Sequence, residues 1–269
     1  MPVGKAVVSL INSVPAPLAA YLRTDRALTG LLRPIVNRLM PSGLMKVKVR
    51  SGAGAGLWLI IDARNEKFFW TGTHECSVQQ ALCEILKPGM VFWDVGANIG
   101  FLSLIASRCV GAAGRVHAFE PMHANRKRLA KNIAINGGGN VTIHDCALAA
   151  SSGEAVLHSH YSPLMWTLLP ERGQREGIVV RCETLDELAD RLGAPDLIKV
   201  DTEGNELEVL RGGSALLSSK MPALLYETDK ATLAETRNLL PAYRFRRLDE
   251  RHWLLRAEDP DRNSKTPDE

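Results

Sequence analysis

The sequence predicts an α/β fold built on a mostly parallel sheet, in which strands and helices alternate along the chain. Three observations lead to this prediction. The apolar run at residues 90–93 breaks into a glycine-rich turn, after which apolar residues recur with helical spacing through residues 102–106. Short apolar runs then alternate with helical patterns as far as Glu227. Two strand patterns, at residues 243–247 and 252–256, complete the sheet.

The residues that precede the alternating pattern are of two kinds. Residues 1–45 are apolar and basic, and prolines interrupt an uncharged stretch that is too short to span a membrane, so we expect a helical segment there. It could serve as a lid, as a peripheral contact with an anionic membrane surface, or as an oligomer contact. Residues 46–62 predict a small β-hairpin, and His74 and Glu75 open a helix that stops before Pro88.

In the central part of the chain, strand and helix patterns alternate clearly enough to predict the bounds of each element. A capping box at Thr184 and Glu187 marks the start of one helix, and three glycines end another at residue 137. We expect strands at residues 115–119, 141–144, 154–161, 178–181, 196–200 and 223–226, and helices at 122–136, 185–192 and 206–217. The patternless polar stretch at 162–177 predicts a substrate-side loop, and residues 258–269 a disordered tail. The expected domain therefore spans residues 46–257.

Composition limits the classes of function. The chain of 269 residues is 45% hydrophobic, which suffices for one globular core with additions. Its formal charge of +3 is too small to indicate a nucleic-acid partner. The charge is unevenly distributed, because residues 1–50 carry +7 and the remainder −4. Five cysteines without a C-x-x-C pair predict reduced thiols, a cytoplasmic location and no zinc site.

The glycine-rich turn reads Asp94-x-Gly96-x-Asn98-x-Gly100. It lacks the dinucleotide fingerprint G-x-G-x-x-G, because Asn98 and Phe101 stand where the second and third glycines would be. A carboxylate at the end of the strand repels a pyrophosphate and attracts a ligand that carries an ammonium and a sulfonium. The turn therefore favours S-adenosylmethionine as the ligand.

Acidic residues end five of the predicted strands. They are Asp94, Glu120, Asp145, Asp201 and Glu227. Because the carboxyl ends of parallel strands share one edge of a sheet, we expect these side chains to line a single ligand crevice. Glu120 follows Gly100 by twenty residues, the distance at which such folds place an acid on ribose hydroxyls.

Three stretches together resemble the FkbM family of S-adenosylmethionine-dependent methyltransferases. They are VFWDVGANIGFLSLIAS, VHAFEP and DLIKVDTEGNELEVLRGG, and the resemblance runs from about residue 47 to residue 227, with Thr202 where the family commonly has valine. It implies a Rossmann-like class I methyltransferase fold, with a mostly parallel seven-stranded sheet and an antiparallel closing strand. It also implies O-methylation of a hydroxyl on a sugar, glycolipid or secondary metabolite.

The turn and the resemblance together indicate which residues would bind the cofactor. Glu75 stands where the family has an acid before the turn, which implies contact with the methionine end of the cofactor. Asp145 would accept from the adenine amine, with Cys146 and Ala147 beside the ring. The full set is Glu75, Asp94, Gly96, Asn98, Gly100, Glu120, Asp145, Cys146 and Ala147.

Asp201 and Glu227 are the candidate catalytic residues. Asp201 could act as general base, as orienter of the acceptor or as a metal ligand, or it could simply cap the following helix. A variant in which Asp201 and either Glu227 or Asp229 hold Mg²⁺ is not favoured, and no dedicated metal site is expected. His74, His158 and His160 are weaker candidates for the base.

The preferred interpretation is thus a methyltransferase with a small-molecule or glycan acceptor and no nucleic-acid partner. Two alternatives stay open. One is N-methylation in the same fold, and the other is a nucleotide-cofactor-binding protein without catalysis, or an enzyme that uses NAD. The oligomeric state is left open.

Overall fold

The computed structural model describes residues 43–159, 166–168 and 177–257. The expected N-terminal helical segment up to residue 42, most of the expected loop at 162–177 and the expected tail at 258–269 lie outside this part. The chain divides into two compact units, residues 1–76 and 77–269. Among the described residues, no helix combines the length and the apolar character that crossing a membrane requires.

The first unit contains the predicted hairpin. Strands β1 (Leu44–Lys48) and β2 (Trp58–Asp62) pair antiparallel, with Lys46 opposite Ile60. The short helix α4 (Lys67–Thr71), which was not predicted, follows and ends at Gly72, whose φ is +77°. Only glycine fits at this helix end, because a Cβ at position 72 would lie 1.9 Å from the carbonyl oxygen of Ser51.

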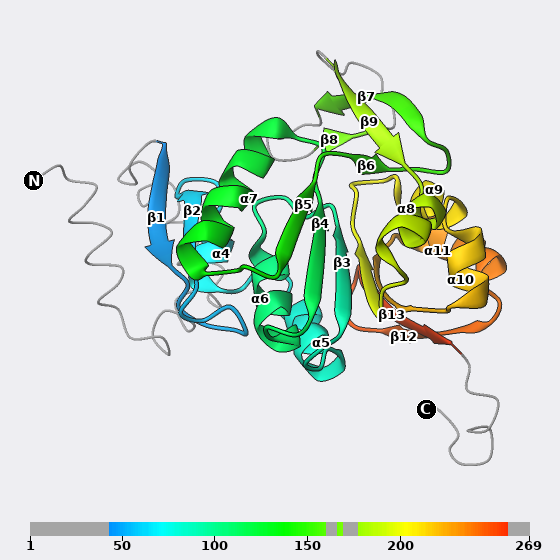
Figure 1. Ribbon diagram of the computed structural model, residues 1–269, viewed down its shortest axis with the longest axis horizontal. Coiled ribbons are helices and arrows are strands. Elements are labelled where there is room, and N and C mark those ends of the chain that lie inside the picture. Colours follow the sequence, from blue (N-terminus) through cyan, green and yellow to red (C-terminus); the bar gives the residue numbers. More distant parts are fainter. Residues whose placement is uncertain (1–42, 160–165, 169–176, 258–269) are drawn as a thin grey trace, which may run out of the picture. The chain divides into compact units, whose positions relative to one another are not determined.

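The second unit is built on a seven-stranded sheet (Figure 1). Its strands, in spatial order, are β12 (Tyr243–Arg247), β13 (His252–Ala257), β11 (Ala223–Glu227), β10 (Leu197–Val200), β3 (Val91–Val95), β4 (Arg115–Phe119) and β5 (Val141–His144). The pairs among the last five strands are parallel, and β13 is antiparallel to both of its neighbours. The predicted class I methyltransferase fold is confirmed.

The order of the strands reverses between β3 and β10. The chain runs from β3 outward to β4 and β5, and later from β10 outward in the other direction to β11. In an open α/β sheet, ligands bind beyond the carboxyl ends of the strands at such a switch point. The turn after β3 and the loop after β10 therefore border the expected crevice.

Helices pack on the sheet and connect its strands. They are α5 (Cys76–Ile85), α6 (Phe101–Val110), α7 (His123–Asn136), α8 (Leu185–Leu192), α9 (Glu206–Arg211), α10 (Ser214–Ser219) and α11 (Lys230–Leu239). Helix α6 contacts β3, β4 and β5. One hydrophobic core joins Trp93, Ile198 and Tyr226 of the sheet to Leu188 of α8 and Leu210 of α9. Burial of these side chains is the chief stabilising term for the unit.

The single helix predicted at residues 206–217 is wrong. The chain forms α9 and α10 instead, with a break at Gly212 and Gly213. A Cβ at position 212 would lie 2.1 Å from the carbonyl oxygen of Ala149. The chain therefore bends where another segment approaches its backbone, and periodicity alone does not reveal that approach.

A second sheet of four strands follows β5. It consists of β6 (Ala147–Leu148), β9 (Gly177–Glu183), β7 (Gly153–Ser159) and β8 (Trp166–Thr167), in that spatial order. Strands near 154–161 and 178–181 were predicted, but β6 was not. Ala147 pairs with Cys182 only two residues after Asp145, so the expected adenine segment leads directly into this sheet.

Candidate active site

The turn after β3 is held by its own backbone. The N–H groups of Gly96 and Ala97 both donate to the carbonyl oxygen of Phe119, at 3.1 and 3.0 Å, and that of Gly100 donates to Ala97. Gly96 has a φ of +79°, and a Cβ there would lie 1.8 Å from the carbonyl oxygen of Asp201. Gly96 is thus required by the close approach of the two segments at the switch point.

Glu120 ties this turn to the end of β4. Its carboxylate is 5% exposed and accepts the backbone N–H groups of Asn98 and Met122, both at 2.8 Å. Burial raises the pKa of Glu120, and these hydrogen bonds oppose the rise. With Asn98 donating to a carboxylate, the N–H groups of the turn point inward to protein acceptors, which is the opposite of a phosphate cradle.

A buried lysine, Lys199, lies between two of the predicted acids. Its Nζ is 2.8 Å from Asp201 Oδ2 and 3.8 Å from Asp94 Oδ1. Asp94 and Lys199 are opposite each other in the pairing of β3 with β10, and Asp201 follows Lys199 by two residues. All three side chains therefore point to one face of the sheet. Ser103 of α6 donates to Asp94 Oδ2.

Glu227 continues this line of charges on the next strand. It is 8% exposed, hydrogen-bonds with Asp201 and pairs with Arg251 at 2.6 Å. Burial and the neighbouring Asp201 raise the pKa of Glu227 well above its usual range, and Arg251 opposes the rise. Burial and Asp201 also raise the pKa of Glu203, whose φ is +57°.

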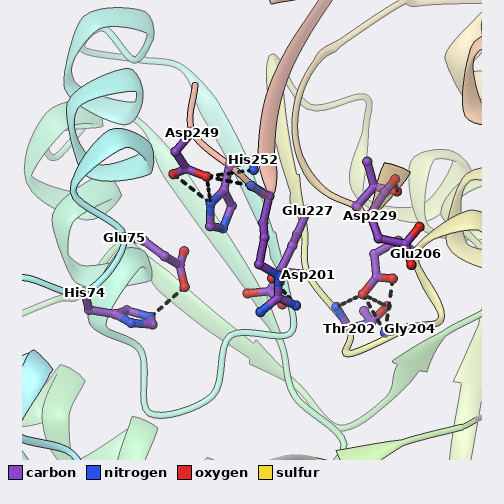
Figure 2. Close-up of polar contacts among 12 residues, drawn as sticks. His74, Glu75, Asp201, Thr202, Gly204, Glu206, Glu227, Asp229, Asp249 and His252 are labelled. Carbon is purple, nitrogen blue, oxygen red and sulfur yellow. Dashed lines mark hydrogen bonds and ion pairs between the residues drawn. The ribbon is translucent and has the colours of Figure 1, made fainter. Parts of the chain in front are cut away.

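The loop after β10 is organised by Glu206 (Figure 2). This carboxylate accepts the backbone N–H groups of Thr202 at 2.7 Å and Gly204 at 2.9 Å. Asn205 occupies the N-cap position of α9, and its side chain donates to the carbonyl oxygen of Leu148 at 3.0 Å. Asn205, and not Asp201, therefore occupies the N-cap position, and Glu206 accepts the N–H groups of the loop. Asp201 contacts Lys199 and Glu227 instead.

Asp145 forms an ion pair that the sequence did not suggest. Its two oxygens lie 2.6 and 2.7 Å from the guanidinium nitrogens of Arg126, and its side chain is 71% exposed. Arg126 also donates to the carbonyl oxygen of Glu120 at 3.0 Å, which links the ends of β4 and β5. Cys146 and Ala147 are buried, and burial raises the pKa of Cys146 to about 12.

Two other predicted residues have local partners. Glu75 belongs to the first unit, where its carboxylate is 2.7 Å from Nε2 of His74, and its contact with the cofactor stays a prediction. Asp229 caps α11 by accepting the backbone N–H of Thr232 at 2.8 Å. Within the described ranges, no three His, Cys, Asp or Glu side chains are grouped so that they could hold a metal ion.

The structure thus brings together Asp94, Gly96, Asp201 and Glu227, and it connects Glu120 to them through Asn98. Lys199 and Arg251 are the members of this cluster that the sequence reasoning missed. The alternation in Lys199-Val200-Asp201 could have shown that Lys199 shares a face with Asp201. No local signal marked Arg251.

Comparison with known proteins identifies relatives of this chain. The family model described as the methyltransferase FkbM domain matches residues 94–247. Hexuronic acid methyltransferase AglP of Haloferax volcanii is 31% identical over 165 residues, which cover 61% of this chain and 62% of that protein. The 31-O-demethyl-FK506 methyltransferase FkbM of Streptomyces tacrolimicus is 30% identical over 161 residues, or 47% of this chain and 60% of that protein. The chain thus spans about three fifths of the length of these two curated relatives.

The chain is also similar to a solved structure. The methyltransferase FkbM from Methylobacillus flagellatus KT superimposes with a TM-score of 0.45 at 19% identity, covering 71% of this chain and 52% of that one.

Proposed function

The chain belongs to the FkbM methyltransferase family, and on that premise we propose that it transfers a methyl group from S-adenosylmethionine to a hydroxyl of a small-molecule or glycan acceptor. One observation carries the proposal. At the switch point of the sheet, the carboxylates of Asp94 and Glu120 are buried, and the backbone N–H groups of the turn after β3 donate to protein acceptors. Such an edge attracts a cationic ligand and offers little to a pyrophosphate.

The residues at the switch point fit this cofactor. Asp94, 1% exposed at the end of β3, would attract the ammonium or the sulfonium, and the lone pairs of Glu120 would accept the ribose hydroxyls. Gly96, Asn98 and Gly100 would line the turn beside it. Asp145, Cys146 and Ala147 remain the proposed adenine contacts, and Glu75 the proposed contact with the methionine end. When bound, the cofactor supplies an electrophilic methyl carbon.

Asp201 and Glu227 would position the acceptor. The two carboxyl groups share a hydrogen bond, and their remaining lone pairs can accept from a hydroxyl of the acceptor. The ammonium of Lys199, 2.8 Å away, balances the negative charge of Asp201. This pair orients a polar group without a metal ion, and Mg²⁺ bound by Asp201 and Glu227 remains the less favoured variant.

The relatives suggest the class of acceptor. One is named for a hexuronic acid and another for 31-O-demethyl-FK506, each at about 30% identity. Both names point to organic acceptors of small or moderate size, so we propose a hydroxyl on a sugar or secondary metabolite. N-methylation in the same fold is the alternative, and mass spectrometry of the methylated product would separate the two.

Calorimetry on the full chain tests the proposal. We expect S-adenosylhomocysteine to bind, NAD to give no heat, and Asp94→Asn to abolish S-adenosylhomocysteine binding. Asp201→Asn should leave this binding intact and lower turnover on a methyl glucuronide probe. The exposed Asp190→Asn is the matched control and should change neither. Heat from NAD without heat from S-adenosylhomocysteine would overturn the proposal.

A further inference from the structure

We propose that His252, held by Asp249, is the base that removes the proton from the acceptor hydroxyl. The inference rests on the function proposed above and names a catalytic residue for it.

Asp249 is surrounded by donors that fix its orientation. It accepts the backbone N–H groups of Arg251 and His252, each at 2.9 Å, and the hydroxyl of Ser77. Both of its oxygens also lie 2.9 Å from Nδ1 of His252. Burial raises the pKa of Asp249, but these hydrogen bonds outweigh burial and hold the pKa well below its usual range.

An ionised carboxylate can only accept hydrogen bonds, so Nδ1 of His252 must carry the proton. Nε2 is then the basic nitrogen of the neutral ring. Figure 2 shows the contacts between Asp249 and the His252 ring. A carboxylate that orients an imidazole and stabilises its protonated form is the arrangement that makes histidine an effective general base.

His252 lies beside the acid pair. In the antiparallel pairing of β11 with β13, it is directly opposite Glu227. The backbone N–H of Thr228, the residue after Glu227, donates to the carbonyl oxygen of Arg251, the residue before His252. Directly opposed residues point to the same face of a sheet, so Lys199, Asp201, Glu227 and His252 form one continuous row. The His252 side chain is 13% exposed, which leaves part of it accessible.

The acids in this row are poorly suited to take the proton. Asp201 is engaged by Lys199 and by its hydrogen bond with Glu227, and Glu227 pairs with Arg251. His252 is the next side chain along the row, and its Nε2 can accept a proton. The two acids then hold the acceptor, and the imidazole receives its proton.

The proposed step balances. The acceptor O–H bond breaks and its proton moves to Nε2 of His252, while the oxygen forms a bond to the methyl carbon. The C–S bond breaks in the same displacement, and its electron pair stays on sulfur. The products are a methyl ether, S-adenosylhomocysteine and an imidazolium next to Asp249, which later releases its proton to water.

Kinetics of the full chain with methyl glucuronide as the probe acceptor test this role. His252→Asn should lower kcat about 100-fold or more, the usual contribution of a positioned general base. It should leave the Kd for S-adenosylhomocysteine within about twofold. Asp249→Asn should lower kcat less, because Nε2 is retained but its orientation is lost. The exposed His123→Asn is the matched control and should retain wild-type turnover.

The split between kcat and KM separates catalysis from packing. His252→Asn should lower kcat and leave the KM for the acceptor within about twofold, because the variant removes a group that acts on the reacting hydroxyl in the transition state. Asp249, Glu227 and Ser77 are unchanged in this variant. Wild-type turnover, or a rise in KM without a fall in kcat, would overturn the inference.

NMR provides a readout that needs no turnover. In full-length protein with ¹⁵N-labelled histidine, His252 should be the Nδ1–H tautomer, and Asp249→Asn should change that pattern. An Nε2–H tautomer for His252 would overturn the inference even if no acceptor turns over. Absence of S-adenosylhomocysteine binding in the wild type would instead contradict the proposed function, so the two failures are distinguishable.

Discussion

At the scale of single residues, the site depends on how Lys199 compensates Asp94 and Asp201. Acids at strand ends are visible in the sequence, but a row of them is stable only with a balancing charge. Lys199 is 4% exposed and lies within 4 Å of both carboxylates. An uncompensated buried charge is strongly destabilising, so the lysine serves the fold as well as the site.

Lys199→Met tests this compensation. Methionine keeps much of the volume but removes the ammonium that pairs with Asp94 and Asp201, so we expect a loss of about 3–5 kcal/mol in the free energy of unfolding. Urea unfolding followed by circular dichroism measures it. The exposed Lys220→Met should stay within about 0.5 kcal/mol of wild type. Equal midpoints for the two variants would contradict the compensating role.

At the scale of elements, the strand, turn and helix from β3 to α6 meet the loop after β10. Each N–H of the turn discussed above donates inside the protein, and the turn leaves room for the carbonyl of Asp201 only because residue 96 has no side chain. Packing therefore requires glycine at position 96 whether or not a ligand is bound. The same geometry brings Asp94 and Asp201 to one crevice.

Gly96→Ala should be costly for this arrangement. The added methyl would lie 1.8 Å from the carbonyl oxygen of Asp201 at a φ of +79°, so we expect a loss of about 2–4 kcal/mol. Thermal and urea unfolding measure it, and binding of S-adenosylhomocysteine should weaken in parallel. Gly139→Ala is the control, because nothing lies within 4 Å of its Cβ. Equal stability of the two variants would show that the loop after β10 moves freely away.

At the scale of the whole molecule, stability depends on burying a pair of histidines that the mechanism does not use. His117 Nδ1 of β4 lies 2.9 Å from His144 Nε2 of β5, and Trp93 and Phe119 contact these rings. Burial, with help from its neighbour His144 and from Arg115, lowers the pKa of His117 to about 4. Burial also lowers the pKa of His144.

This burial predicts a loss of stability in acid. The unfolded chain binds a proton at His117 near pH 6.5, whereas the folded protein resists protonation down to about pH 4. The unfolded state thus binds more protons between these values, and stability falls as the pH is lowered through them, by about 3 kcal/mol from His117. Urea midpoints at pH 7, 6 and 5 measure this. His117→Gln should flatten the dependence, and His123→Asn should retain it; identical slopes would refute the assignment.

How much could be predicted from the sequence differs between the fold and the site. Apolar runs, glycines and the Thr184 capping box are local signals, and they predicted most strands and helices of the sheet. The break between α9 and α10 was missed because it depends on contact with Ala149. The acids of the site were predicted because they end strands, but their partners Lys199 and Arg251 were not predicted.

The sequence by itself determined the parallel sheet and its acidic edge, because strand ends and hydrophobic periodicity are written in neighbouring residues. Only the tertiary structure decided what each acid does. Lys199 reaches Asp94, Glu227 lies opposite His252, and Asp145 meets Arg126 through pairings between segments that are distant in the chain. Register between such segments is set by the packing of the whole core, so the role of each acidic side chain follows from the assembled sheet.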